Sequence, residues 1–151
     1  DKNMFTTVAN LQVPYVLMHM LGTPQNMQKN PIYSDVIKEI ISFFAAQIHK
    51  LHQLKLNDLI IDVGFGFGKT IDHNFEILKN LSLFKSLEAP ILAGISRKSM
   101  LYKTLNISAQ QALNATTSAN TIALLNGANI LRVHDVKEAV EAVKIVNQIS
   151  F

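Results

Sequence analysis

The chain has 151 residues, of which 48% are hydrophobic and 17% are charged, enough for one globular domain with a substantial core. The formal net charge is +3 and the basic residues are dispersed, which argues against a nucleic-acid or membrane-binding surface. Because the chain has no cysteine, disulfides and thiolate metal sites are excluded. No apolar stretch approaches about eighteen residues and the start lacks a signal-peptide pattern, so we expect a cytoplasmic protein.

The amino-terminal segment places Phe5, Val8 and Leu11 at helical spacing, which predicts a helix. The chain starts without methionine and runs directly into this pattern. We therefore expect it to be part of a longer polypeptide.

Four short apolar runs predict β-strands. Each run is rich in branched residues and too short for a core helix. None alternates with polar residues, which is typical of parallel strands covered on both faces. The predicted strands span residues 13–20, 59–63, 90–95 and 130–133.

Helical patterns separate and follow these runs. Ser34 is the predicted N-cap of the longest helix, and the pairs Ser108 with Gln111 and Asp135 with Glu138 have capping-box spacing. The predicted helices cover residues 34–54, 74–87, 108–126 and 135 onward. Because strand, loop and helix alternate four times, the predicted fold class is α/β.

Two α/β architectures remain open, a doubly wound sheet and four units of a TIM-type (β/α)8 barrel. A full barrel needs about 250 residues, so this chain would supply only half of one. In both architectures ligands bind at the carboxyl ends of the strands. Polar, basic and glycine residues follow all four runs, and this repetition predicts a ligand site. They are His19 and Gly22, then Asp62 and Gly64 to Lys69, then Gly94 and Ser96 to Ser99, and finally Arg132, His134 and Asp135.

The glycine-rich segment after the second run resembles a phosphate loop only superficially. A Walker pattern needs glycine where Val63 stands, and the dinucleotide pattern counted from Gly64 needs glycine where Lys69 stands. Alternating glycine and phenylalanine is typical of a tight loop that presents aromatic faces to a flat ring. The alternative is an ordinary β–α turn whose phenylalanines cap the core.

Asp62 ends an apolar run, where a buried carboxylate needs hydrogen-bond donors. It could accept two parallel N–H groups from a 2-amino-4-oxo ring such as a pterin or guanine. Alternatively, backbone amides satisfy a structural acid.

Basic residues follow the third and fourth runs. Arg97 and Lys98 follow Gly94 at a strand-to-helix turn, which predicts an anion site to which Arg132 and His134 add positive charge. The alternative for Arg97 and Lys98 is a solvated helix start.

The other histidines are weaker candidates for function. His49 and His52 lie on the polar side of the long helix and are predicted to be surface residues. His73 lies near a helix start, and His19 is either a site residue or a core histidine.

Four motifs, in the family's order along the chain, together resemble the dihydropteroate synthase family of pterin-binding enzymes. They are Leu17-Met18-His19-Met20 with Gly22-Thr23-Pro24, Asp62-Val63-Gly64-Phe65-Gly66-Phe67-Gly68-Lys69 with His73-Asn74, Gly94-Ile95-Ser96-Arg97-Lys98-Ser99, and Gly127-Ala128 leading into Arg132-Val133-His134-Asp135-Val136. Val63 departs from the usual proline, and Leu21 from a residue that is often polar or basic.

The resemblance implies that residues 1–151 form the carboxyl-terminal half of a pterin-binding (β/α)8 barrel, with strands 5 to 8 and their helices. It implies the condensation of 6-hydroxymethyl-7,8-dihydropterin pyrophosphate with 4-aminobenzoate, which gives 7,8-dihydropteroate and pyrophosphate. Because the family's first four strands carry further site residues, we expect this chain alone to be inactive.

The resemblance also implies a role for individual residues. Catalytic roles fall to Lys98, Arg132 and His134. The pterin would be bound by Met18, Asp62, Gly94, Lys98 and Arg132, the 4-aminobenzoate by Phe67, Lys98 and Ser99, and the pyrophosphate by Arg132 and His134.

The implied cofactor is Mg²⁺, with its principal ligand in the absent amino-terminal half and no metal ligand in this chain. The implied partners are the two substrates, competing sulfonamides and a second copy of the chain in a homodimer. A pterin-dependent methyltransferase domain is the alternative enzyme, but it should lack the paired Ser96-Arg97-Lys98 and Arg132-Val133-His134 segments. A non-catalytic pterin-binding half-barrel is the other alternative.

Overall fold

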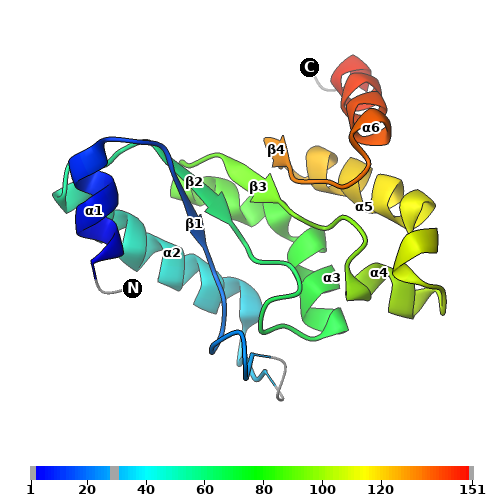
Figure 1. The fold of residues 1–151 in the computed structure, drawn as a ribbon, viewed down its shortest axis with the longest axis horizontal. Coiled ribbons are helices and arrows are strands. Elements are labelled where there is room, and N and C mark those ends of the chain that lie inside the picture. Colours follow the sequence, from blue (N-terminus) through cyan, green and yellow to red (C-terminus); the bar gives the residue numbers. More distant parts are fainter. Residues whose placement is uncertain (1–2, 28–30, 150–151) are drawn as a thin grey trace.

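The computed structural model describes residues 3–27 and 31–149. Four parallel strands form one sheet in the order β1-β2-β3-β4, as the sequence predicts (Figure 1). The strands are β1 (Tyr15–Met18), β2 (Leu59–Asp62), β3 (Ile91–Ala93) and β4 (Ile130–Leu131). All four predicted strands are confirmed, and each is shorter than its apolar run.

Helices connect the strands, so each neighbouring pair of strands is joined by a helical crossover. The helices are α1 (Met4–Leu11), α2 (Val36–Gln53), α3 (Ile71–Lys79), η1 (Leu81–Leu87), α4 (Ser99–Thr104), η2 (Ala109–Gln111), α5 (Leu113–Leu125) and α6 (Val136–Ile149). None of them, in the part of the chain that the structure describes, is long and apolar enough to cross a membrane.

Helix starts depart from the sequence prediction in four places, the first being α3, which begins at Ile71 rather than at residue 74. The N-cap of α2 is Asp35 rather than Ser34, because the backbone N–H and hydroxyl of Ser34 both donate to Glu39. The capping box of Ser108 is present but opens the single turn η2, which precedes α5. Asp135 directs both carboxylate oxygens to Arg97.

The register aligns the site ends of the strands. Met18 is opposite Asp62, Asp62 is opposite Leu92, and Leu92 is opposite Ile130. Because parallel strands all end at the same edge of the sheet, the residues after each strand converge there.

The core lies on the face of the sheet that the helices cover. Ile61 packs there with Ile40 and Phe44 of α2, and all three are fully buried. The prediction that both faces are covered is wrong at β1, where Val16 remains 42% exposed. The reason is that helices such as α2 and α3 lie on one side of the sheet (Figure 1).

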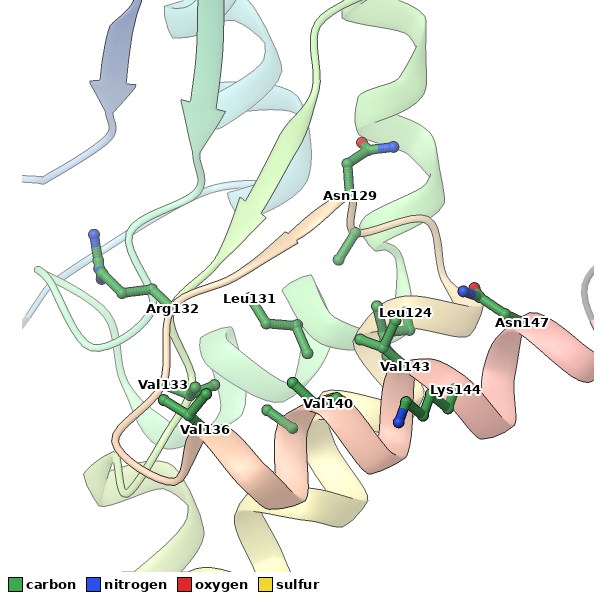
Figure 2. Close-up of a pocket in the computed structure, with 12 residues that line it drawn as sticks. Leu124, Asn129, Leu131, Arg132, Val133, Val136, Val140, Val143, Lys144 and Asn147 are labelled. Atoms are coloured by element: carbon green, nitrogen blue, oxygen red, sulfur yellow. The ribbon is translucent and has the colours of Figure 1, made fainter.

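An apolar cavity of about 950 Å³ lies between β4 and α6, and Arg132 and Val133 of the fourth motif are part of its lining. Leu131, Val140 and Val143 point into it, whereas the guanidinium of Arg132 points away (Figure 2). Its lining contains no acid that could bind an amino-substituted ring.

Candidate active site

Asp62, the last residue of β2, is fully buried. Its Oδ1 accepts the N–H of Gly64 at 2.8 Å, as a structural acid would. Its Oδ2 accepts no well-aligned hydrogen bond from any residue that the structure describes, and lies 3.0 Å from Nη1 of Arg132. Since buried polar atoms are nearly always hydrogen-bonded, the missing hydrogen bond at Oδ2 makes this atom a candidate acceptor for a ligand that displaces the guanidinium.

Arg132 forms an ion pair with Asp62 from the loop after β4. Its side chain is 52% exposed, while that of Asp62 is 1% exposed. A Cβ at Gly94 would lie 2.6 Å from Nη2 of Arg132, so the guanidinium lies directly against the Gly94 backbone. The predicted strand 130–133 ends two residues early, at Leu131, although the N–H of Arg132 still donates to the carbonyl of Ala93 in β3.

The glycine loop after β2 divides its two phenylalanines between core and site. Gly64, Gly66 and Gly68 all have left-handed φ angles, of +71°, +79° and +63°. These angles turn Phe65 into the core, where it is 1% exposed, and leave Phe67 half-buried at the mouth of the site. The reading of a β–α turn that caps the core is confirmed for Phe65, while the presentation of Phe67 to a flat ring stays a prediction.

Phe67 and Lys98 form the wall beside Asp62. The Nζ of Lys98 lies 4.3 Å from the centre of the Phe67 ring, a cation–π distance. Burial lowers the pKa of Lys98, and the nearby Arg132 lowers it further, while Asp62 opposes them. The sequence motifs of β2 and β3 are thus brought together by the fold.

Lys69 and His19 form a buried pair that the sequence did not identify. Nζ of Lys69 lies 3.0 Å from Nδ1 of His19 and donates to the carbonyls of Gly64 and Phe67, also at 3.0 Å. Desolvation lowers the pKa of Lys69 to about 7. Desolvation, and then the charge of Lys69, lowers the pKa of His19 to about 4.

Ser96 and His134 join the ends of β3 and β4. The Ser96 hydroxyl lies 2.9 Å from Nδ1 of His134 and accepts the backbone N–H of the same residue at 3.1 Å. With Gly94, Lys98 and Arg132 they line a cavity of about 200 Å³. The cavity is polar and lies beside three cationic or proton-accepting side chains, so it could accept an anion.

Arg97 does not point its charge into this cavity, which corrects the prediction that its side chain helps to form the anion site. Its guanidinium donates to both carboxylate oxygens of Asp135 and to the carbonyls of Ala109 and Gln110. Its own backbone has a left-handed φ of +54°, and its N–H donates to Thr116. The pairing lowers the pKa of Asp135 and raises that of Arg97. Arg97 therefore holds the loops together.

The remaining predicted site residues lie at the same edge. Met18 is half-buried beside Asp62 in the register, and Ser99 is the half-buried first residue of α4. Of the two departures from the family pattern, Val63 is fully buried and Leu21 is 37% exposed.

Histidines outside this cluster have structural or surface roles. His49 and His52 are exposed, as predicted, and His73 completes the capping box of α3 with Thr70. Among the described residues there is no group of three His, Asp or Glu side chains that could hold a metal ion.

Residues 1–134 match the family described as pterin binding enzyme. The chain belongs to this family. It is 42% identical over 140 residues to dihydropteroate synthase of Escherichia coli K12, an alignment that covers 91% of this chain and 50% of the relative. The chain therefore spans about half the length of the curated relatives that it matches.

Solved structures show the same relationship. The Yersinia pestis dihydropteroate synthase, solved with a sulfonamide drug, is 42% identical with a TM-score of 0.93, covering 96% of this chain and 54% of that one. The Thermus thermophilus enzyme, solved with 4-aminobenzoate, is 31% identical with a TM-score of 0.93, covering 99% and 62%. These enzymes are TIM barrels, so the predicted fold class is confirmed: the four-stranded sheet corresponds to about half of a barrel.

Proposed function

We propose that this chain is the carboxyl-terminal half of a dihydropteroate synthase. The proposed reaction joins 6-hydroxymethyl-7,8-dihydropterin pyrophosphate to 4-aminobenzoate and releases 7,8-dihydropteroate and pyrophosphate. The observation that carries the proposal is the buried Oδ2 of Asp62, which has no well-aligned hydrogen bond and is paired only with the guanidinium of Arg132, beside Lys98 and Phe67.

In the proposed complex, Asp62 accepts N–H groups of the pterin in place of the guanidinium of Arg132. A guanidinium and a 2-amino-pyrimidinone edge both present parallel N–H groups, so one can replace the other at a carboxylate. Gly94 supports this arrangement because it leaves room for a flat ring, and Met18 would line the same pocket from β1. Lys98 would contact the ring from its position over Phe67.

The anion cavity supports the roles proposed for Arg132 and His134. Arg132, once released from Asp62, would bind the pyrophosphate together with His134, which Ser96 orients. The C–O bond to pyrophosphate breaks, and the departing anion takes the electron pair. Positive charge held at the leaving group stabilises the developing anion, and the aryl amine then attacks the pterin methylene and loses a proton. Phe67, Lys98 and Ser99 would bind the 4-aminobenzoate.

Three further features belong to the proposal. We propose that Mg²⁺ is held mainly by residues of the amino-terminal half of the barrel, and no step is assigned to it here. Exposed apolar residues on α6, such as Val140 and Ile145, support a homodimer through the helices near the carboxyl end. We also propose a cytoplasmic location and competition by sulfonamides for the 4-aminobenzoate position.

Calorimetry with a pterin and with inorganic pyrophosphate tests the assignment on this chain. Asp62→Asn should abolish pterin binding and leave pyrophosphate binding intact, because the amide presents N–H groups where the ring needs acceptors. Lys98→Ala should weaken pterin binding and retain the fold. If both ligands bound the Asp62→Asn chain as they bind the unaltered one, the assignment would be wrong.

The chain alone should not turn over both substrates, because it corresponds to about half of the relatives. An assay of dihydropteroate formation with the purified chain tests this expectation. Turnover at the rate of a full-length synthase would contradict it. A non-catalytic half-barrel would also bind ligands without turnover. Adding the amino-terminal half of a relative separates the two hypotheses, because it should restore activity only if this chain is half of a synthase.

A further inference from the structure

Lys69 is enclosed by the glycine loop and is 4% exposed. Its ammonium uses all three protons inside the protein, with Gly64 O, Phe67 O and His19 Nδ1 each at 3.0 Å. No donor of the ammonium is left for a ligand. A buried lysine is costly unless its interactions repay the lost hydration, so its place inside the loop calls for an explanation.

The three bonds join the parts of the loop that face the two proposed ring substrates. Gly64 carries the N–H that donates to Asp62, and Phe67 carries the ring beneath Lys98. His19 anchors the cluster to the end of β1, and its ring packs edge-on against Phe43, with centroids 5.0 Å apart. One ammonium thus links the carboxylate, the aromatic wall and the neighbouring strand.

We propose that Lys69, with His19, is a positioning residue that holds the glycine loop so that Phe67 and Asp62 face the substrates. The inference rests on the proposed function, because it assigns Phe67 to the 4-aminobenzoate. Lys69 acts through the loop and touches neither substrate.

The pairing with His19 lets the contact survive a change of protonation. When Lys69 is charged, Nδ1 of His19 accepts its third proton, so the imidazole proton is on Nε2. When Lys69 is neutral, its two remaining protons serve the carbonyls of Gly64 and Phe67. Its lone pair can then accept a proton from Nδ1–H of His19, whose tautomer changes.

Both protonation states are accessible near neutral pH, since the pKa of Lys69 is about 7. Asp62, at the end of β2, favours the charged ammonium, and Lys98, in the segment after β3, opposes it. Glu39 of α2 favours protonation of His19, against the larger effects of burial and of Lys69. Tyr33 faces the His19 ring with centroids 6.2 Å apart, and its hydroxyl donates to Gly68.

Binding of two different ligands separates a positioning role from a general loss of stability. Lys69→Met should weaken 4-aminobenzoate binding about tenfold, the effect of losing roughly one well-made hydrogen bond to a charged group. Inorganic pyrophosphate, which the proposed function assigns to Arg132 and His134, should bind within about twofold of the unaltered chain. The matched control is Lys79→Met at the exposed last turn of α3, which should change neither affinity.

Equal weakening of both ligands in Lys69→Met would mean a merely structural lysine and would overturn the proposal. So would unchanged affinity for both. If the unaltered chain bound pyrophosphate but no 4-aminobenzoate, the proposed function would be wrong. The role proposed for Lys69 would then be wrong as well, because it depends on that function.

Nitrogen NMR of the His19 ring gives a signature independent of ligand binding. In the unaltered chain Nδ1 should be unprotonated between about pH 4 and 7 and protonated above about pH 7, and the change near pH 7 should disappear in Lys69→Met. A ring that keeps a single tautomer across this range, or one that becomes a cation at the ordinary histidine pKa, would contradict the pairing.

Discussion

Gly94 shows how a single missing side chain shapes the candidate site. A Cβ there would lie 2.6 Å from Nη2 of Arg132. Because Gly94 has no side chain, the flat guanidinium can lie directly against its backbone. Gly64 has a different reason to be glycine, because its φ is +71° and a Cβ would collide with the backbone carbonyl of His19. Gly94 permits the close approach of the guanidinium, at the position proposed for the pterin ring, and Gly64 permits the turn.

We expect Gly94→Ala to fold normally and to lose pterin affinity. The only close neighbour of the new methyl group is the end of a flexible side chain, so the free energy of unfolding should change by about 1 kcal/mol or less. Pterin affinity should fall by about tenfold or more, since the methyl group occupies the ring position. Urea unfolding and calorimetry measure the two quantities. Gly64→Ala is the contrasting variant and should lose stability.

At the scale of elements, Arg97 and Asp135 join the loop after β3 to the start of α6. Ser96 directly precedes Arg97, and His134 directly precedes Asp135. The ion pair therefore fixes the positions of two residues that line the anion cavity. Asp135→Asn should weaken pyrophosphate binding several-fold. Because Arg97 lowers the pKa of Asp135, the ion pair should persist below the ordinary pKa of aspartate. Protonation of Asp135 should therefore not weaken pyrophosphate binding at that pH.

The matched control for this pair is Glu141→Gln on the exposed side of α6. In a double-variant cycle with Arg97→Met, the effect of Asp135→Asn on pyrophosphate affinity should largely vanish. Additive effects would show that the two side chains act independently.

Helix α2 fixes β1 and β2 through Phe44, which is fully buried against Phe84 and His19. Phe44→Ala should reduce the free energy of unfolding by about 3–5 kcal/mol, because it removes an aromatic ring from the core and leaves a cavity. Phe75, 37% exposed on α3, supplies the control, and Phe75→Ala should cost about 1 kcal/mol or less. Similar losses in urea unfolding would contradict this assignment of the core.

For the whole molecule, the buried His19 makes stability depend on pH. Its pKa is about 4 in the folded chain and 6.5 when exposed, so between these values the unfolded chain binds a proton that the folded chain does not. Stability should therefore fall as the pH drops from about 6.5 to 4, by an amount on the order of 2 kcal/mol.

Comparison of variants isolates this contribution from that of the carboxylates. His19→Gln should flatten the pH dependence of unfolding between pH 4 and 6.5, while His49→Gln, at an exposed position, should not. The same slope in all three chains would show that His19 is not the group responsible.

Much of the fold was predictable from local patterns. All four strands and the α1, α2 and α6 helices were located because apolar residues recur with the period of a buried strand or an amphipathic helix. The second predicted helix, 74–87, is instead α3 followed by η1, since apolar spacing does not distinguish an α-helix from a tighter turn. The N-cap of α2 was misplaced by one residue because Ser34 and Asp35 are both good capping residues.

The position of the candidate site residues at the strand ends was predictable, but their contacts were not. Arg97 pairs with Asp135, and Arg132 pairs with Asp62. Both pairings depend on the directions of side chains that follow different strands, and the sequence pattern does not give these directions. Lys69 and His19 are fifty residues apart, and no local pattern pairs them.

By itself, the sequence determined which residue types follow each strand, and hence the family, the α/β class and a candidate ligand site at one edge of the sheet. Only the tertiary structure decided which of those residues lie together at the proposed site and which hold the loops. The physical reason is that hydrophobic periodicity is a property of neighbouring residues, whereas the pairing of buried charges depends on which distant donors and acceptors the packed strands bring within about 3 Å. That is why Lys98 and Arg132 lie at the proposed site while Arg97 and Lys69 support it.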